Sequence, residues 1–445
     1  MKTKHIFIVG FMLFAMFFGA GNLIFPPALG FASGNQFFLA ILGFVITGVG
    51  LPLIGVITGS ISKDGYGESL KNISPWFSIV FLVAIFLTIG PFFAIPRTAT
   101  TAYEMGIVPF TGSPGTVSLL IFSIIYFAVV FILSYRPGNI IDSVGKVLTP
   151  LLLVTMVLLI FVGIIAYNSN PVNPASEAFN SAAPFSTGFT EGYLTMDAIA
   201  AIVFSVVVLN AIRGLGISNR RELLFGTIKS AGLAALLLGV IYIALGFLGN
   251  RVNIGDAQMG EQNPGTFLLT FIANDTLGNF GGYLLGLIVF LACITTGVGL
   301  VVAVSEHFSK LLPKIKYGVW VFVFTFVSFV LANQGLSTII KGSVPVLLVI
   351  YPIAMTVLVL LIVTYFIPSP RLSLQIPVYI VTLISVLTVI FRNDYFGVKA
   401  LEVLNLQVLE ALPLFEAQFE WIPIMIIGYV LGYLIGFKGE KATYS

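Results

Sequence analysis

The first hydrophobic run of the chain, residues 6–31, contains the stretch Phe17-Phe18-Gly19-Ala20-Gly21-Asn22-Leu23-Ile24-Phe25-Pro26-Pro27. Gly19 and Gly21 free the backbone, Asn22 competes with it for hydrogen bonds, and the prolines leave carbonyl groups one turn earlier without helical partners. Lipid cannot satisfy such carbonyls, so a helix broken at membrane depth must face protein, water or a bound solute. The stretch favours a transporter site, in which half-helix N-termini face a substrate carboxylate and unwound carbonyls hold a cation. The alternative is a kink that only helps two helices to pack.

The composition indicates an integral membrane protein. Of the 445 residues, 58% are hydrophobic and 9% are charged, whereas soluble domains carry about 25% charged residues. The net charge of +3 is too small to indicate a nucleic-acid partner. The single cysteine, Cys293, excludes a disulfide framework within the chain. Because P-loop, dinucleotide-binding, hydrolase and zinc-protease motifs are absent from the sequence, we expect neither an ATP-driven pump nor an enzyme.

Twelve hydrophobic segments approach the ~20 residues that a bilayer core requires. They cover residues 6–31, 36–60, 75–102, 115–134, 147–167, 191–213, 226–249, 281–307, 317–333, 343–367, 376–391 and 419–437. If the N-terminus is inside, all but five of the 21 basic residues lie on the inner side, where Lys and Arg are favoured. The outer five are Arg97, Arg251, Lys341, Arg392 and Lys399. We therefore expect a multi-pass protein of the cell membrane with both termini cytoplasmic.

If segments one to five form a unit, its odd number of segments predicts an inverted repeat. The next five segments would then enter the membrane from the opposite face, with broken helices at matching positions in segments one and six. Segment six carries Asp197 about two turns from its outer end. A charge at that depth usually marks a pathway or a partnered site. Alternatively, the helix begins later and Asp197 is an N-cap at the interface.

Segment eight contains adjacent hydroxyl groups at Thr295 and Thr296, followed by small residues. Neutral oxygen atoms suit a hard cation such as sodium. Two hydroxyl groups and carbonyls freed in segment one would form a cage of five oxygen atoms between the two helices. The alternative is that both hydroxyl groups only bond to carbonyls of their own helix.

Three further features are expected on the outer side. Pro91, Pro96 and Arg97 near the outer end of segment three favour a bent helix that lines a pathway; the alternative, which we expect for Arg97, is a side chain that extends to the outer headgroups. Residues 168–190 form a long loop rich in Asn, Ser, Pro and Ala. Residues 250–282 form a second loop, in which the apolar patch 267–272 predicts a short helix over the outer mouth; the alternative is a plain solvated loop.

Three motifs resemble those of the bacterial branched-chain amino acid:cation symporters, the BrnQ-type carriers, over about residues 6–437. They are Phe18-Gly-Ala-Gly-Asn-Leu-Ile-Phe-Pro-Pro27, Gly90-Pro-Phe-Phe-Ala-Ile-Pro-Arg-Thr-Ala99 and Glu191-Gly-Tyr-Leu-Thr-Met-Asp-Ala198. This family is similar to the amino acid–polyamine–organocation superfamily. The resemblance implies an all-α membrane fold with the LeuT-type five-plus-five inverted repeat, in residues 6–167 and 191–367, and two additional helices in residues 376–437.

The resemblance also implies a function. It is sodium-coupled symport of leucine, isoleucine and valine into the cell by alternating access. The alternative is a proton-coupled or exchange carrier of the same fold for another small amino acid or metabolite. Proton-coupled relatives often place a lysine inside segment five, but Lys146 lies at its cytoplasmic mouth and residues 147–166 carry no charge, which favours sodium. We expect no cofactor besides the coupling ion and no obligate protein partner.

The site residues follow from the same resemblance. The substrate would bind to the backbone of segment one and to a pocket partly formed by segment six, at Gly19, Ala20, Gly21, Asn22, Tyr193, Thr195, Met196 and Asp197. Asn22 is alternatively a ligand of a second ion. Sodium would bind to the carbonyls of Ala15, Phe18 and Ala292 and to the hydroxyl groups of Thr295 and Thr296.

Overall fold

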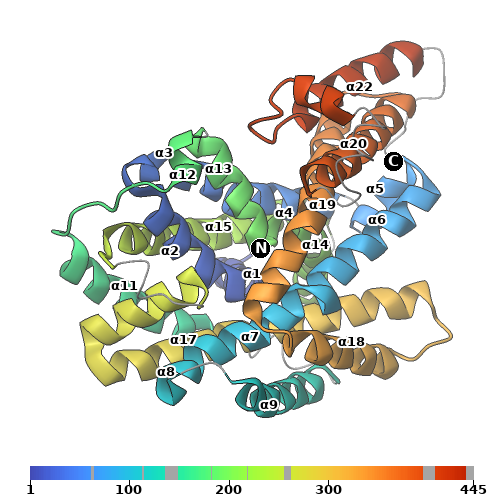
Figure 1. Ribbon diagram of the computed structural model, residues 1–445. Coiled ribbons are helices and arrows are strands. Elements are labelled where there is room, and N and C mark those ends of the chain that lie inside the picture. Colours follow the sequence, from blue (N-terminus) through green and yellow to red (C-terminus); the bar gives the residue numbers. More distant parts are fainter. Residues whose placement is uncertain are drawn as a thin grey trace.

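The computed structural model describes residues 1–61, 65–112, 115–135, 149–181, 183–217, 219–254, 262–393 and 406–436. This part of the chain is folded as helices joined by short connections (Figure 1). It contains nine helical stretches that are long and apolar enough to cross a membrane, and α1, α18 and α22 are shorter apolar helices. The predicted all-α membrane fold is thus confirmed, whereas the count of twelve passes stays a prediction.

The helices follow one another along the chain with few long connections. The first part comprises α1 (Thr3–Phe17), α2 (Ala20–Ser33), η1 (Gly34–Gln36), α3 (Phe37–Val45), η2 (Ile46–Gly50), α4 (Leu51–Ile61), α5 (Tyr66–Lys71), α6 (Pro75–Leu87), η3 (Thr88–Phe92), α7 (Ala94–Gly106), α8 (Val108–Thr111), α9 (Thr116–Tyr135) and α11 (Thr149–Tyr167). The second part comprises α12 (Glu177–Ser181), α13 (Pro184–Glu191), η6 (Gly192–Thr195), α14 (Asp197–Gly214), α15 (Arg220–Arg251), α17 (Pro264–Leu311), α18 (Tyr317–Ala332), α19 (Leu336–Phe366), α20 (Leu372–Asn393), η7 (Leu406–Ala411) and α22 (Trp421–Gly436).

Three helical segments are interrupted where they approach one another. The first is broken between α1 and α2, where Phe18 and Gly19 leave the helical conformation. The second passes through η3, in which Gly90 is non-helical (φ −88°, ψ −122°). The third passes through η6 to Met196, which adopts the left-handed conformation (φ 65°, ψ 7°) just before α14. The Gly-rich stretch thus breaks its helix as predicted, and segment six is broken without any Gly-x-Gly.

Helix α2 is fixed to α15 by a very close approach of the two backbones. A Cβ atom on Gly249 of α15 would lie only 2.1 Å from the carbonyl oxygen of Pro27, so glycine is required there. The next residue, Asn250, donates from Nδ2 to the carbonyls of Gly30 (3.0 Å) and Gly34 (2.8 Å) at the end of α2. These bonds satisfy carbonyl groups that a helix end leaves free. Helix α2, the second half of the broken segment, is therefore held in one orientation.

The expected outer loops are more ordered than the sequence indicates. The apolar patch 267–272 lies in the first part of α17, which Asn263 caps and which kinks at Gly278 (φ 60°). Gly265 packs against the carbonyl of Ile24, so this helix contacts α2. The expectation of a loop over residues 168–190 is wrong for α12 and α13, because Pro184–Glu191 forms a helix packed against α3. Residues 255–261 lie outside the described ranges.

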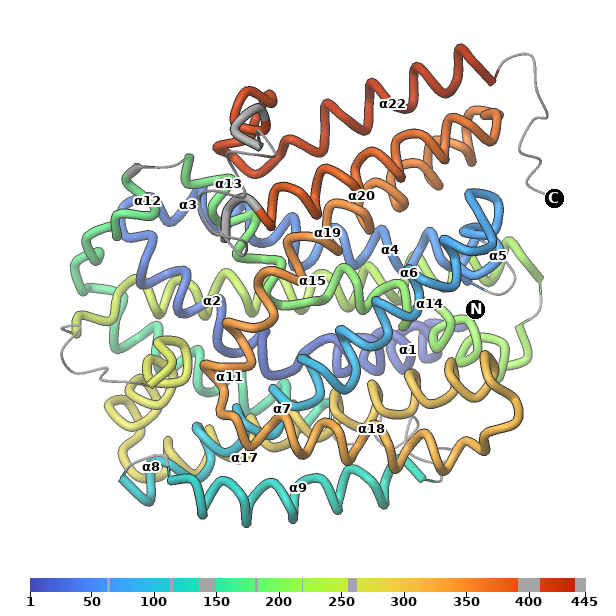
Figure 2. Tube along the Cα trace, turned by 45° about the vertical axis from the view of Figure 1, so that its right-hand side comes forward, coloured from blue at the N-terminus to red at the C-terminus, as the bar shows by residue number. Residues whose placement is uncertain are grey.

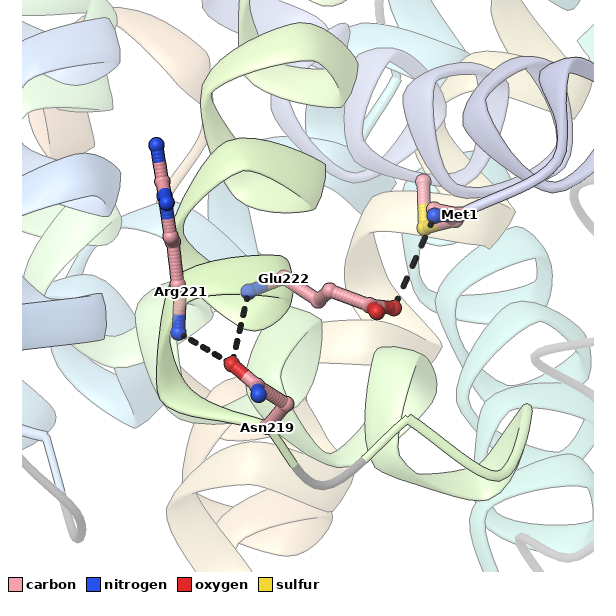
Figure 3. Close-up of polar contacts among 4 residues, drawn as sticks. All are labelled: Met1, Asn219, Arg221 and Glu222. Carbon is pink, nitrogen blue, oxygen red and sulfur yellow. Dashed lines mark hydrogen bonds and ion pairs between the residues drawn. The ribbon is translucent and has the colours of Figure 1, made fainter.

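The C-terminal helices α20 and α22 pack side by side at one edge of the molecule, next to α19 (Figure 2). At the start of α15, Asn219 Oδ1 accepts from the backbone N–H groups of Arg221 and Glu222 (Figure 3). The Glu222 carboxylate lies 3.8 Å from the amino group of Met1. The N-terminus and the α14–α15 connection therefore lie on the same side, as the expected topology requires.

Which side of the membrane this is stays a prediction. Several of the loop charges that determine it lie outside the described residues: Lys63, Arg136, Lys146, Lys399, Lys438 and Lys441.

Candidate functional site

The three helix breaks surround a cavity in the interior of the protein. The residues that line it are Met16, Phe17, Gly19, Ala20, Gly21, Asn22, Ile89, Ala94, Arg97, Thr98, Thr195, Met196, Asp197, Ala200, Phe204, Thr296 and Leu300. The free volume of this cavity is about 20 Å³, roughly what one water molecule needs. An amino acid could enter only if lining side chains moved.

Seven of the eight residues expected to bind substrate line this cavity. The exception is Tyr193, which is buried outside the lining and stacks on Tyr351 of α19 with ring centroids 4.2 Å apart. Its neighbour Thr195 faces the cavity but bonds to its own backbone, because Oγ1 donates to the carbonyl of Gly192 (2.9 Å). The structure therefore brings segments one and six together, and it places the Tyr193 ring in a stack outside the cavity lining.

Asn22 joins the start of α2 to two other helices. Its Oδ1 accepts from the backbone N–H of Gly19 (3.0 Å), which caps α2. Its Nδ2 donates to Oδ2 of Asp197 (2.6 Å) and also contacts the hydroxyl group of Tyr242 in α15. The Tyr242 hydroxyl in turn donates to the same Asp197 oxygen (2.8 Å). The amide of Asn22 thus bonds to Gly19, Asp197 and Tyr242 of the protein itself.

Asp197 combines features of both sequence alternatives. It is the first residue of α14, so the helix does begin later than residues 191–213 suggest. However, its side chain is only 3% exposed and faces the cavity, not the membrane interface. The left-handed conformation of Met196 turns the chain into α14 and places the carboxylate against Asn22 and Tyr242. A buried carboxylate needs such donors, because desolvation of a charge is costly.

The expectation that Arg97 extends to the outer headgroups is wrong. The side chain is 3% exposed and lines the cavity. Its Nη1 donates to the carbonyl of Leu194 (2.6 Å), and Nη2 donates to that of Thr195 (3.3 Å). The reason is geometric: the break at Gly90 starts a new helix at Ala94 that continues to Gly106, so Arg97 lies in its first turn and not at the outer end.

The Thr295 and Thr296 hydroxyl groups lie between α17 and the end of α1, where Thr296 Oγ1 is also 3.4 Å from the carbonyl oxygen of Met16, which is not in the expected set. Thr296 Oγ1 lies 3.5 Å from the carbonyl oxygen of Ala15 and 3.4 Å from that of Phe18. Thr295 Oγ1 lies 3.5 Å from the Ala15 oxygen and 3.0 Å from that of Ala292. Only the last distance reaches the 2.5–3.0 Å range of a normal O–H···O hydrogen bond. The hydroxyl groups therefore approach the opposite helix without bonding to it tightly.

The sequence analysis does not place two residues of the site: Arg97, which lines the cavity, and Tyr242, which is not in the lining but bonds to Asp197. Arg97 was assigned to the surface, and Tyr242 lies in an apolar helix with no motif around it. The signal for Arg97 is its place beside Pro91 and Pro96, which favours a bent helix that lines a pathway. Nothing in the sequence near Tyr242 indicates that its hydroxyl group meets Asp197.

Sequence comparison relates this chain to carrier proteins. Residues 2–438 match the sequence model of a family described as branched-chain amino acid transport protein. A protein of Staphylococcus aureus, provisionally named a branched-chain amino acid carrier protein, is 48% identical over 441 residues, which are 98% of this chain and 97% of that protein. A protein of Staphylococcus saprophyticus with the same description is 47% identical over 445 residues, covering 99% and 98%.

Solved structures of transporters are similar in fold. The chain matches Mhp1, a nucleobase-cation-symport-1 family transporter, with a TM-score of 0.57 at 15% identity, covering 96% of this chain and 91% of that one. A manganese transporter of Eremococcus coleocola matches with a TM-score of 0.59 at 13% identity, covering 98% of this chain and 96% of that one. MhsT in complex with L-phenylalanine matches with a TM-score of 0.52 at 16% identity, covering 96% of this chain and 97% of that one. At these identities the likeness extends to the fold alone.

Proposed function

Because the chain belongs to the family of branched-chain amino acid transport proteins, and is thus a multi-pass membrane transporter and not an enzyme, we propose that it imports leucine, isoleucine and valine together with sodium. One observation carries the proposal: the hydroxyl groups of Thr295 and Thr296 approach the carbonyls of a broken helix at distances too long for ordinary hydrogen bonds. The cell membrane is the location that this function requires.

The distances within the five-atom cage suit a bound cation. A cation that holds oxygen atoms at about 2.4 Å, a distance found for calcium sites, separates neighbouring ligands of an octahedron by about 3.4 Å. Thr296 Oγ1 lies 3.4–3.5 Å from two of the carbonyl oxygens. None of the five atoms carries a formal charge, which suits a monovalent ion better than a divalent one. Sodium is therefore the coupling ion that the donor set favours.

The cavity next to the cage suits a small apolar amino acid. The backbone N–H groups of Ala20 and Gly21 begin α2 and would face the carboxylate of the substrate. Met16, Phe204 and Leu300 provide apolar walls for its side chain. Because one methylene group is worth only about 1–3 kcal/mol in such a pocket, leucine, isoleucine and valine should compete. Polar amino acids should bind much more weakly.

We further propose the LeuT-type organisation for the chain. Residues 6–167 and 191–367 would be inverted repeats, residues 376–437 would add two helices to give twelve, and both termini would be cytoplasmic. The breaks before α2 and before α14, each in the first segment of its repeat, support this assignment. Sodium would fix α1 to α17 and preorganise the break for the substrate, so each ligand would raise the affinity of the other by the same factor. Rocking of one bundle against the other would alternate access.

The test is uptake of radiolabelled leucine into proteoliposomes, with an inward sodium gradient compared with an inward proton gradient. We expect the sodium gradient alone to drive uptake, and the Thr295→Ala/Thr296→Ala variant to lose it. Thr325→Ala is the matched control, because Thr325 is a buried threonine of α18 away from the cavity. Uptake driven only by protons and unchanged in the double variant would refute the sodium site and favour a proton-coupled carrier of the same fold.

A further inference from the structure

Arg97 is a buried charge to which the proposed function gives no part. Among the described residues, no carboxylate lies within 4.0 Å of its guanidinium group. The ion pair found in that part of the chain joins Met1 to Glu222. Its two hydrogen-bond acceptors are neutral backbone carbonyls of η6, those of Leu194 and Thr195. An intramembrane arginine is costly and usually has a functional partner. The neutral contacts orient the guanidinium group but do not neutralise it.

The guanidinium group lies directly against the start of α2. A Cβ atom on Gly21 would be 2.7 Å from Nη2 of Arg97 and 3.1 Å from its central carbon, so only glycine leaves room for this contact. The first turn of a helix exposes N–H groups and carries a partial positive charge. The guanidinium group of Arg97 and the positive N-terminal end of α2 thus meet in one wall of the cavity. This arrangement is unfavourable unless an anion lies between them.

A negative charge lines the same cavity. Asp197 reaches it from the start of α14, and both of its side-chain hydrogen bonds, from Asn22 and Tyr242, arrive at Oδ2. Arg97 and Asp197 are nevertheless too far apart for an ion pair, whose limit is 4.0 Å. A cation alone would be repelled by Arg97 and an anion alone by Asp197. A solute that carries both charges can place its negative group against Arg97 and its positive group against Asp197.

We propose that Arg97 binds the carboxylate of the amino acid while Asp197 faces its ammonium group. This inference rests on the proposed function, and it adds the residue that makes the site specific for a zwitterion. A guanidinium group suits the task because its planar donors match a carboxylate. The first turn of α2 would donate to the same carboxylate from its other side.

The test separates binding of the carboxylate from a merely structural role. Purified protein in detergent with sodium is titrated with leucine, with 3-methylbutylamine, which lacks the carboxylate, and with 4-methylpentanoate, which lacks the amine. In the wild-type protein leucine should bind at least 100-fold more tightly than the amine. In Arg97→Gln this ratio should fall below about tenfold, because leucine loses affinity and the amine does not. If Arg97 only braced η6, leucine and the amine would weaken by the same factor, and the proposal would be wrong.

Arg251→Gln is the matched control. Arg251 also donates to two backbone carbonyls, those of Asn168 and Asn170, and its guanidinium carbon lies 5.3 Å from the ring of Phe247, as that of Arg97 does from Phe25. It does not line the cavity, so Arg251→Gln should keep the wild-type ratio.

A second variant covers the case in which Arg97→Gln does not fold. Gly21→Ala keeps the arginine but displaces its Nη2, so the ratio of leucine to amine affinity should fall in the same direction by a smaller factor. An unchanged ratio in Gly21→Ala would then overturn the proposal. Failure of the proposed function looks different: the wild-type protein itself would show no sodium-dependent binding of leucine.

Discussion

A methyl group added at Gly19 tests the contact between the broken helix and the cation cage. The Cβ atom of Gly19→Ala would lie 2.8 Å from Oγ1 and 3.0 Å from Cγ2 of Thr296, closer than real Cβ contacts. Gly19 itself is extended (φ −123°, ψ −157°), so alanine brings little backbone strain. The expected cost is therefore that of overpacking, about 1–3 kcal/mol. Since Thr296 must stay in place to hold the ion, sodium affinity should fall about 5- to 150-fold.

The assay is the sodium dependence of leucine binding in detergent, measured for the single variant and for Gly19→Ala/Thr296→Ser. Serine removes Cγ2 but keeps the hydroxyl group, so the double variant should regain part of the lost affinity. Gly232→Ala in α15 is the control, because nothing lies within 4 Å of the added methyl group. Wild-type sodium affinity in Gly19→Ala, with leucine binding intact, would show that Thr296 is not a ligand.

Three further outcomes follow from individual contacts in the interior. Tyr242→Phe removes one donor to Asp197 and should weaken leucine binding by about 1.5–3 kcal/mol, measured by equilibrium binding; Tyr283→Phe, at an exposed ring, should leave it unchanged. Met196→Gly relieves a left-handed conformation (φ 65°), worth about 1–2 kcal/mol, but it removes a side chain that is 2% exposed, which costs about 2–5 kcal/mol; the unfolding temperature in detergent should therefore fall, and a higher one would contradict this. Asn250→Ala removes two bonds to the end of α2 and should lower stability by about 1–3 kcal/mol, whereas an unchanged melting curve would refute the cap.

The parts of the site that local chemistry specifies could be predicted from the sequence. The stretch around Gly19 and Gly21 favours a break, which therefore follows from residues adjacent in the chain, whereas Pro26 and Pro27 remain inside α2. The hydroxyl pair Thr295–Thr296 is also visible locally, and the structure brings it to Ala15 and Phe18.

The parts that depend on tertiary packing could not be predicted. Met196 has no intrinsic preference for the left-handed conformation that starts α14, so the surrounding structure must impose it. The depth of Arg97 depends on where the break at Gly90 restarts the helix. Tyr242 meets Asn22 across 220 positions of sequence, a separation over which a single sequence carries no pattern.

Asn22 links two properties that protein engineering would prefer to change separately: the cap of α2 at the helix break and the bonding of Asp197 in the cavity. Its oxygen caps α2 through Gly19, and its nitrogen bonds to Asp197. An aspartate at position 22 would keep the cap but set two carboxylates against each other, and a serine would keep at most one of the two bonds. Selection for carriers with a new substrate range should therefore leave Asn22 fixed and randomise Met16 and Leu300, whose side chains line the cavity.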